Sequence, residues 1–332
     1  MARVHYVLTV LAALAVLFIA AEAGTMTAEQ QFRQFAAQYG KSYASEEFGE
    51  RLRIFRDNLD RIDALNSANT GARYGINKFA DLTPKEFKAT YLKGARSAGQ
   101  KKAAAPAKLD MTGPLPSQFD WRDKGAVTPT KDQGQCGSCW AFSVTEAIES
   151  QWFLSGRKLV SLAPQQIVDC DQGNGDYGCD GGDTPTAYEY VIKAGGLDTE
   201  ESYPYTAEDG QCAFKPSAVG AKISNWTYIT TTKNETEMQY GLASRGPLSI
   251  CVDASSWQYY IGGVITSLCE DSLDHCVMIT GYSVQEGWDF MKYDVWNIRN
   301  SWGEDWGYGG YLYVQRGSNL CGVGDEVTIP LV

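Results

Sequence analysis

Residues 133–140 read QGQCGSCW and place two cysteines three positions apart at the start of a helical pattern. Residues 139–155 repeat apolar side chains at helical spacing, and Gly156 suits the C-terminal cap of a helix. The positive end of the helix dipole favours the thiolate of a cysteine in the first turn. Cys139 is therefore the candidate nucleophile.

Other kinds of site also use a CxxC spacing like that of Cys136 and Cys139. In a thioredoxin-like redox pair, tryptophan usually precedes the first cysteine, whereas here Trp140 follows the second. A zinc site would need a second CxxC or paired histidines, and neither occurs. Both readings stay open as disfavoured alternatives.

Histidine is rare in this chain, which contains only His5 and His275. His5 lies in a predicted signal peptide and is removed with it. A lone histidine is more often a packed or surface residue than a base. If the mature protein uses histidine for proton transfer, that residue is His275, which lies in the sequence LDHC.

Three separated motifs, QGQCGSCW, LDHC and NIRNSWG, follow one another along the chain. Together they resemble the papain family of cysteine proteases, of the cathepsin L type, from about residue 28 to the C-terminus. The resemblance implies a papain-like α+β fold of two domains, one helical and one β-barrel-like, after an N-terminal helical propeptide. It implies a cysteine endopeptidase that acts through an acyl-enzyme and needs no cofactor or metal.

The local patterns of the catalytic region agree with this plan. Helices are expected at 139–155, 164–170 and 185–193, and strands at 222–229, 248–254, 275–283, 291–298 and 310–315.

The resemblance assigns a role to each residue of the catalytic group. Cys139 and His275 would meet across the cleft as a thiolate–imidazolium pair. Asn300 would orient the imidazole by accepting its second N–H, and Trp302 would shield that hydrogen bond from water. Gln133 and the backbone N–H of Cys139 would bind the oxyanion that forms during attack.

The resemblance also predicts the substrate-binding residues. Gly181 and Gly182 would pair through their backbone with an extended substrate, because glycine permits a close approach. Glu326 would lie at the floor of the pocket for the second residue before the cut, and its carboxylate would admit arginine as well as an apolar side chain. An exposed Glu326 is the alternative. The remaining predicted residues are Gly137, Trp140, Asp183, Thr184, Cys251, Leu273, Asp274, Cys276 and Trp302.

The nine cysteines all follow residue 130, and an odd count in a secreted chain suggests one free thiol. Cys251 and Cys276, which depart from the commonest family pattern, lie on two strands expected to be neighbours. We predict a disulfide between them, with two buried free thiols as the alternative. The family pattern implies the other bridges, Cys136–Cys179, Cys170–Cys212 and Cys269–Cys321.

The region ahead of the catalytic motifs resembles the inhibitory propeptides of the same family. The resemblance implies that residues 24–114 run through the cleft in reverse and block it, and that acid promotes release as carboxylates protonate. One stripe of a long helix comprises Glu47, Arg51, Phe55, Asn58, Ile62 and Asn66, and the motif after it comprises Gly75, Asn77, Phe79 and Asp81.

Residues 93–108 read KGARSAGQKKAAAPAK and are basic, small and poor in large apolar groups. This composition describes an exposed linker open to proteolysis. We expect self-processing near residues 108–115, just before Leu115-Pro116, which leaves residues 115–332 as the peptidase domain.

The N-terminus predicts entry into the secretory pathway. Residues 7–20 are fourteen mostly apolar residues after a positive start, and Ala21-Glu22-Ala23 offers a signal-peptidase site, so residues 1–23 are the expected signal peptide. Fourteen residues are too few to span a bilayer comfortably, and no later segment is long and apolar enough. A lysosome-like vacuole and the extracellular space both fit. Sequons at Asn225 and Asn234 lie in a polar, Thr-rich stretch expected to be exposed and glycosylated.

The net charge of −11 disfavours nucleic acid as a partner, because phosphate binding needs a basic face. The expected partners of this monomeric chain are polypeptide substrates, its own propeptide and cystatin-like inhibitors. A single mature histidine excludes a paired-histidine loop that would close one end of the cleft, which favours internal cleavage. A non-enzymatic binding or storage protein on the same fold is the second hypothesis, disfavoured because all four catalytic residues are present.

Overall fold

The computed structural model describes residues 26–68, 71–94, 106–173 and 175–332. The expected signal peptide and most of the expected linker lie outside these residues. The chain divides into two compact units, one up to Arg56 and one from Asp57 onward. Within the described ranges, no helix combines the length and apolar character needed to cross a bilayer.

Aromatic rings hold the first unit together. Helix α2 (Ala28–Gln38) places Phe32 and Phe35 on its buried side. Both rings lie 5.3 Å from the ring of Phe55, which belongs to the first part of helix α3 (Ser45–Ser67). The long helix predicted from the stripe of recurring residues is therefore confirmed, and α3 continues into the second unit.

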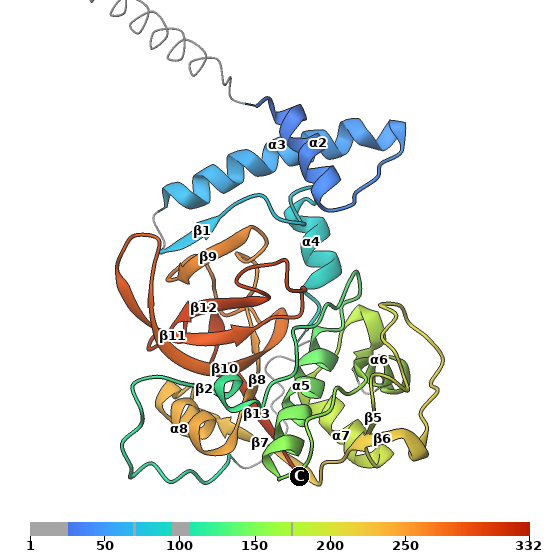
Figure 1. Cartoon of the computed structure of the whole chain (residues 1–332), viewed down its shortest axis with the longest axis vertical. Helices are drawn as coiled ribbons and strands as arrows, with labels where there is room; N and C mark the ends of the chain where they lie inside the picture. The colour runs from blue at the N-terminus through green and yellow to red at the C-terminus, as the bar shows by residue number, and fades with distance from the viewer. Residues whose placement is uncertain (1–25, 69–70, 95–105, 174) are drawn as a thin grey trace, which may run out of the picture. The chain divides into compact units, whose positions relative to one another are not determined.

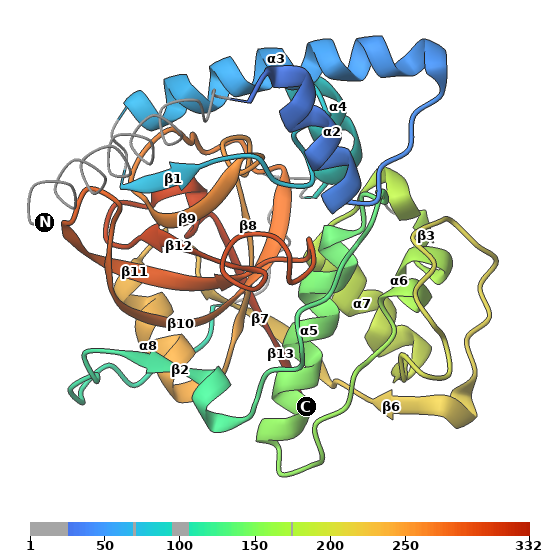
Figure 2. The ribbon, with the colours of Figure 1, turned by 45° about the horizontal axis from the view of Figure 1, so that its top comes forward.

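One half of the second unit is helical (Figures 1 and 2). Helix α5 (Cys139–Leu154) is buried over its first twelve residues, and its sequence is apolar on most sides, as a helix inside a domain must be. Helices α6 (Pro164–Cys170) and α7 (Thr184–Ala194) pack against it. The predicted bounds of these three helices agree with the structure to within one residue at each end.

The other half is a mostly antiparallel sheet with the order β1-β9-β12-β11-β10-β8-β13-β7, and β2 also pairs with β10. Strand β10 is central in the sheet, because it pairs with β8, β11 and β2. Its first residue is His275. The strands are β1 (Ala72–Tyr74), β2 (Phe119–Asp120), β7 (Asn225–Thr230), β8 (Leu248–Val252), β9 (Tyr260–Ile265), β10 (His275–Glu286), β11 (Lys292–Arg299), β12 (Tyr311–Gln315) and β13 (Glu326–Leu331).

The smaller elements complete the chain. They are α4 (Pro84–Tyr91), α8 (Glu235–Arg245), the strand pairs β3 (Gln172–Gly173) with β4 (Asp176–Tyr177) and β5 (Leu197–Asp198) with β6 (Val219–Ala221), and the 3₁₀ turns η1 (Trp121–Lys124), η2 (Gly178–Asp180), η3 (Pro216–Ala218) and η4 (Leu320–Gly322).

The Thr-rich stretch around the two sequons differs from the expectation. Residues 226–230 of β7 are buried rather than exposed, because the strand pairs with β13. Asn225 itself is exposed at the start of that strand. Asn234 caps helix α8, where its side-chain oxygen accepts the backbone N–H of Thr236 at 2.9 Å. The expected exposure is therefore wrong for residues 226–230, where β-branched threonines suit a strand, and is confirmed for Asn225 and residues 231–233.

The motif predicted to follow the long helix docks onto the sheet. Strand β1 pairs antiparallel with β9. The buried Asn77 donates a hydrogen bond to the carbonyl of Gln258 at 2.8 Å. Phe79 packs edge-on against Trp302, with ring centroids 5.5 Å apart. These contacts fix the chain directly ahead of helix α4.

Candidate active site

Cys139 is the first residue of helix α5 and is fully buried. All nine cysteines lie in the described residues, and Cys139 is the one outside any disulfide. The predicted bridge between Cys251 and Cys276 is present, so the alternative of two buried thiols is wrong. The other three bridges are Cys136–Cys179, Cys170–Cys212 and Cys269–Cys321, as expected.

The backbone of Cys276 lies next to the Cys139 sulfur. A methyl group placed on Gly94 would be 3.0 Å from the Cys139 sulfur, 3.0 Å from the Cys276 nitrogen and 2.9 Å from the Cys276 sulfur. These three atoms therefore border the same small space. Because His275 directly precedes Cys276, strand β10 delivers the predicted base to the side of the nucleophile.

The ring of His275 is held on two sides. Its Nε2 lies 2.7 Å from Oδ1 of Asn300, and a carboxamide oxygen only accepts, so Nε2 carries the proton of the neutral ring. Trp302 stacks on the ring with centroids 4.8 Å apart, and all three residues are buried. The other nitrogen, Nδ1, is buried without a hydrogen-bond partner, which leaves its lone pair available for a proton.

Gln133 is oriented by a residue that the sequence analysis missed. The hydroxyl of Ser301 donates to Oε1 of Gln133 at 2.7 Å, so Nε2 points the other way as a donor. This Nε2 donates to the carbonyl of Cys136 at 2.9 Å and more weakly to that of Tyr91 at 3.4 Å. Tyr91 belongs to the predicted propeptide. The donor predicted to bind the oxyanion thus already contacts a carbonyl of the chain's own N-terminal region.

Glu326 lies beside the extra disulfide. It pairs with Cys251 between strands β13 and β8, and its Oε1 is 3.4 Å from the Cys251 sulfur. The same oxygen accepts the hydroxyl of Thr184 at 2.8 Å. Leu273 packs against the apolar cluster that contains both bridged cysteines. These predicted pocket residues are therefore neighbours in the structure.

The predicted backbone-pairing edge is occupied by the chain itself. Gly182 forms an isolated parallel bridge with Gly94. A side chain on Gly181 would collide with the carbonyl oxygen of Lys93, and one on Gly182 would lie 2.7 Å from the ring of Trp140. Glycine at position 181 therefore lets Lys93 approach closely, whereas glycine at position 182 makes room for the ring of Trp140. Asp183, the next predicted pocket residue, is buried at the N-terminal end of α7.

Lys93 and Gly94 pack against residues of the predicted active site, so the predicted linker does not begin at residue 93. The N–H of Gly94 donates to the carbonyl of Asp274 at 3.0 Å, and the Lys93 ammonium lies 2.8 Å from the Asp180 carboxylate. A methyl group on Gly137 would be 2.5 Å from the Lys93 side chain. A small, basic sequence looks the same whether solvent or a cleft surrounds it, which explains the error.

The burial of the site in the precursor changes the protonation of Cys139 and His275. Burial raises the pKa of the Cys139 thiol to about 11, although nearby backbone N–H groups, including that of Cys276, favour the thiolate. Burial also lowers the pKa of His275 to about 4, and the hydrogen bond to Asn300 opposes this only in part. The covered site therefore favours a neutral thiol and a neutral imidazole, and the expected ion pair is not the favoured state of the precursor.

Ion pairs connect the predicted propeptide to the catalytic region. In each pair a lysine between residues 78 and 93 meets an aspartate of residues 115–332, so the charges are complementary. Lys78 is the least exposed of these lysines and contacts two carboxylates. The pairs are Lys78–Asp132 at 2.8 Å, Lys78–Asp305 at 3.0 Å, Lys88–Asp274 at 3.4 Å and Lys93–Asp180 at 2.8 Å.

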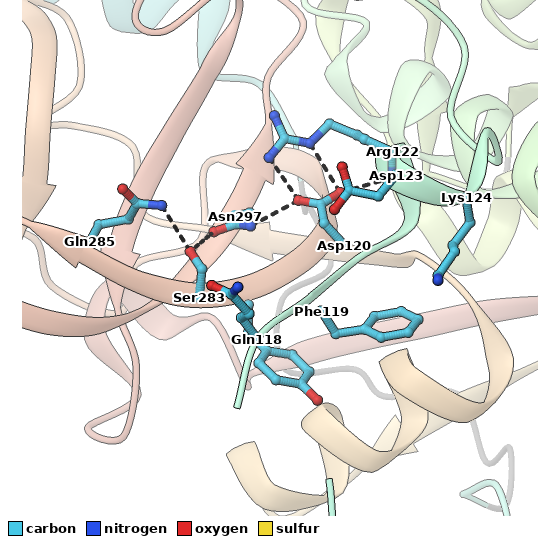
Figure 3. A pocket seen from close by; sticks show the side chains of 10 residues that line it. Gln118, Phe119, Asp120, Arg122, Asp123, Lys124, Ser283, Gln285 and Asn297 are labelled. Atoms are coloured by element: carbon cyan, nitrogen blue, oxygen red, sulfur yellow. Dashed lines mark hydrogen bonds and ion pairs between the residues drawn. The ribbon is translucent and has the colours of Figure 1, made fainter. Parts of the chain in front are cut away.

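A polar surface pocket of about 310 Å³ lies beside strand β10 and shares no residue with the predicted site (Figure 3). Its carboxylate, Asp120, accepts hydrogen bonds from Arg122 and Asn297 at 2.7 and 2.8 Å. Ser283 donates to Asn297 at 2.8 Å, and Gln285 donates to Ser283 at 3.1 Å. Five of the polar side chains that line this pocket are thus joined in one hydrogen-bond chain. Nowhere in the described ranges do three or more His, Cys, Asp or Glu side chains group as metal ligands.

Comparisons with known proteins agree with this geometry. The family model for papain family cysteine protease matches residues 115–331, and the model for the cathepsin propeptide inhibitor domain matches residues 32–87. Cysteine proteinase 1 of Dictyostelium discoideum is 44% identical over 331 residues, which cover 95% of this chain and 96% of that protein. Digestive cysteine proteinase 2 of Homarus americanus is 40% identical and covers 96% of this chain and 99% of its own length.

Solved precursor structures share the fold. Digestive procathepsin L2 from the larval midgut of Tenebrio molitor superposes with a TM-score of 0.84 at 34% identity, over 92% of this chain and all of that one. The recombinant stem bromelain precursor gives a TM-score of 0.82 at 32% identity, over 92% of this chain and 99% of the other.

Proposed function

The chain belongs to the papain family of cysteine proteases and is made as a zymogen inhibited by its propeptide; on this basis we propose that Cys139 is its nucleophile and His275 its general base. Asn300 orients the imidazole, and Gln133 with the Cys139 N–H binds the oxyanion. The observation that carries the proposal is the place of the free cysteine. It begins a buried helix beside the backbone of strand β10, under a segment of its own precursor.

The chemistry begins when the propeptide leaves. Water and substrate then reach Cys139 and His275, and the burial that holds both groups neutral is relieved, so the thiol can transfer its proton to Nδ1. The thiolate attacks the peptide carbonyl carbon, and the carbonyl oxygen takes the negative charge beside the Gln133 amide. The imidazolium gives its proton to the leaving amine, which leaves a thioester. Water, deprotonated by His275, hydrolyses that thioester and restores the thiol.

Activation requires a cut between the propeptide and the peptidase domain. We place it near residues 108–115, so that residues 24–114 leave and residues 115–332 remain. Residues 110–114 are all exposed, which supports access by a protease. Ion pairs between lysine and carboxylate weaken in acid, so acidic pH should favour release of the segment that carries Lys78, Lys88 and Lys93.

The precursor rich in disulfides points to the secretory pathway, and so does the digestive role named for relatives in lobster and mealworm. Within that pathway we propose a lysosome-like vacuole or the extracellular space, with glycans on Asn225 and Asn234. The mature enzyme acts as a monomer on polypeptide substrates, and cystatin-like proteins inhibit it.

Activation of the purified precursor at acidic pH tests the proposed function. The wild-type precursor should shorten to a fragment that begins near Leu115 and cleaves a peptide after an internal Phe-Arg sequence. One equivalent of an epoxide thiol inhibitor should stop the cleavage by alkylating Cys139. The Cys139→Ala precursor should stay intact alone, yet be shortened by added wild-type enzyme, which shows that it is folded. Self-processing of this variant at the normal rate would refute the assignment.

A further inference from the structure

The loop after β5 places a tyrosine against the back of the predicted oxyanion site. The hydroxyl of Tyr205 donates to the backbone carbonyl of Gln133 at 2.7 Å. It also lies 2.6 Å from the hydroxyl of Ser138. A phenol has one proton, so when Tyr205 donates it to Gln133, Ser138 must be the donor in the second bond. One hydroxyl thus joins two segments of the backbone.

Those two segments carry the two proposed oxyanion donors. Gln133 supplies its side-chain amide, and Ser138 directly precedes Cys139, whose backbone N–H is the second donor. The distance between the donors depends on how these segments are held, because no secondary structure pairs residue 133 with residue 138. An oxyanion site works only when its donors are fixed before the charge develops.

The ring of Tyr205 is itself fixed. It meets Phe142, on the first turn of α5 after Cys139, edge-on with centroids 4.7 Å apart. Its backbone N–H donates to the carboxylate of Glu200 at 3.0 Å. A residue restrained at both ends can restrain its neighbours in turn, whereas a mobile side chain could not.

We infer that Tyr205 is a positioning residue of the oxyanion site, which sets the spacing between the Gln133 amide and the Cys139 N–H. This inference rests on the proposed function, since it assigns Tyr205 a part in the same reaction. Tyr205 acts through its contacts with Gln133 and Ser138 and not by touching the substrate. Its effect therefore belongs to steps in which the carbonyl oxygen becomes negative.

The variant Tyr205→Phe tests the inference, because it keeps the ring and removes only the bridging hydroxyl. We expect kcat for a peptide amide to fall roughly five- to tenfold, because losing one hydrogen bond usually costs that much in rate, and KM to stay almost unchanged. A peptide aldehyde, which forms an oxyanion on Cys139, should bind more weakly by a similar factor. Alkylation of Cys139 by iodoacetamide forms no oxyanion and should keep its rate and pH profile.

Two comparisons make the test specific. Tyr203→Phe also removes a hydroxyl from this loop, but that hydroxyl bonds to Asp169 at 2.7 Å and should leave all three measurements unchanged. If Tyr205 acts by setting the spacing of the two donors, the double variant Tyr205→Phe, Gln133→Ala should lose less than the product of the two single losses; fully multiplicative losses would overturn the inference.

The results separate the two proposals. A wild-type enzyme without thiol-dependent cleavage would overturn the proposed function itself. A working wild type whose Tyr205→Phe variant has normal kcat and normal aldehyde binding would overturn only the role of Tyr205. Equal losses in kcat and in alkylation rate would also overturn it, because a general distortion would then explain both.

Discussion

Glycine at position 94 decides how closely the propeptide approaches the catalytic sulfur. The N–H of Gly94 donates to the Asp274 carbonyl. A side chain on Gly94 would contact both the Cys139 sulfur and the Cys276 sulfur. A methyl group there would come within 3.0 Å of three atoms, closer than normal contact. The close approach of the predicted propeptide to the Cys139 sulfur therefore depends on the absence of a side chain at position 94.

Gly94→Ala should loosen this cover in the intact precursor. Overpacking of this kind usually costs about 1–3 kcal/mol, so Cys139 should react with iodoacetamide roughly tenfold faster at neutral pH. The measurement is the labelling rate, with a gel to show that the chain stays uncut. Gly113→Ala is the matched control, because a methyl group there meets no atom within 4 Å. Equal labelling rates for the two variants would contradict the argument.

A second residue-scale prediction concerns the carboxylate of Glu326. This group is partly buried beside the Cys251–Cys276 disulfide and can pair with a substrate guanidinium. Glu326→Gln keeps the shape and removes the charge. We expect the ratio of kcat/KM for Arg-Arg over Phe-Arg peptides to fall roughly fivefold, as for a charged hydrogen bond that becomes neutral.

Glu286→Gln is the control for charge alone, because Glu286 is exposed at the far end of β10. It should leave the ratio unchanged. If Glu326→Gln also leaves it unchanged, arginine tolerance does not come from this carboxylate.

The catalytic residues could be proposed from the sequence because their chemistry limits the choice. One mature histidine and one unpaired cysteine leave few assignments, and the structure places Cys276, the residue after His275, beside the Cys139 sulfur. Ser301 and Lys93 could not be found in this way. A serine next to Asn300 has no distinctive pattern, and a lysine beside a glycine looks like solvated chain until the cleft is folded around it.

At the scale of elements, the segment from β1 to α4 is held by packing and by charge. Lys78 lies between Asp132 and Asp305 and is only 16% exposed, so its pairs are less screened by solvent than that of Lys88, which is 59% exposed. Lys78 is thus the lysine whose ion pairs should restrain the propeptide most strongly.

Lys78→Met should shift acid processing of the precursor to higher pH. The substitution removes the two pairs at every pH, so the rate in mild acid should rise by roughly fivefold, the effect of about 1 kcal/mol. The fraction of processed chain is measured against pH. Lys85→Met is the control, since Lys85 is an exposed lysine of helix α4. A pH profile that does not move would show that this ion-pair network does not restrain the propeptide.

Elements with a strong period were predictable, and those defined by tertiary contacts were not. The bounds of α6 follow from Pro164 at its first position and a short apolar pattern. Strand β9 was missed because Gly262 and Gly263 interrupt its apolar run, and β1 was missed because it is too short to show a period. Helix α8 was missed because its polar start had been assigned to an exposed stretch.

At the scale of the whole molecule, buried charges join the helical half to the sheet. Glu146 and Glu149 lie on α5, and the fully buried Arg299 of β11 approaches Glu146 at 3.3 Å. Glu149 accepts hydrogen bonds from Lys131, Thr128 and the N–H of Leu162. Oε1 of Glu146 accepts none. A proton taken up by this group of charges therefore goes to Glu146.

Burial raises the pKa of Glu146 to about 7, against the opposing effect of Arg299 and Lys131. The folded pKa lies above the unfolded one, so folding favours the protonated acid. The resulting stabilisation is complete below pH 4.5, the ordinary pKa, and is lost as the pH rises through about 7. The contribution of this single group therefore favours the folded state more in acid than at neutral pH.

Glu146→Gln should reduce this pH dependence, because glutamine is neutral at every pH. With Cys139→Ala in both chains to prevent self-cleavage, the melting temperature of the parent should fall from pH 5 to pH 7.5 by a few degrees more than that of the glutamine variant. Glu201→Gln makes the same charge change at an exposed site and should follow the parent. Parallel melting curves for Glu146→Gln and its parent would mean that Glu146 is ionised throughout, and that the pairing with Arg299 outweighs the cost of burying both charges.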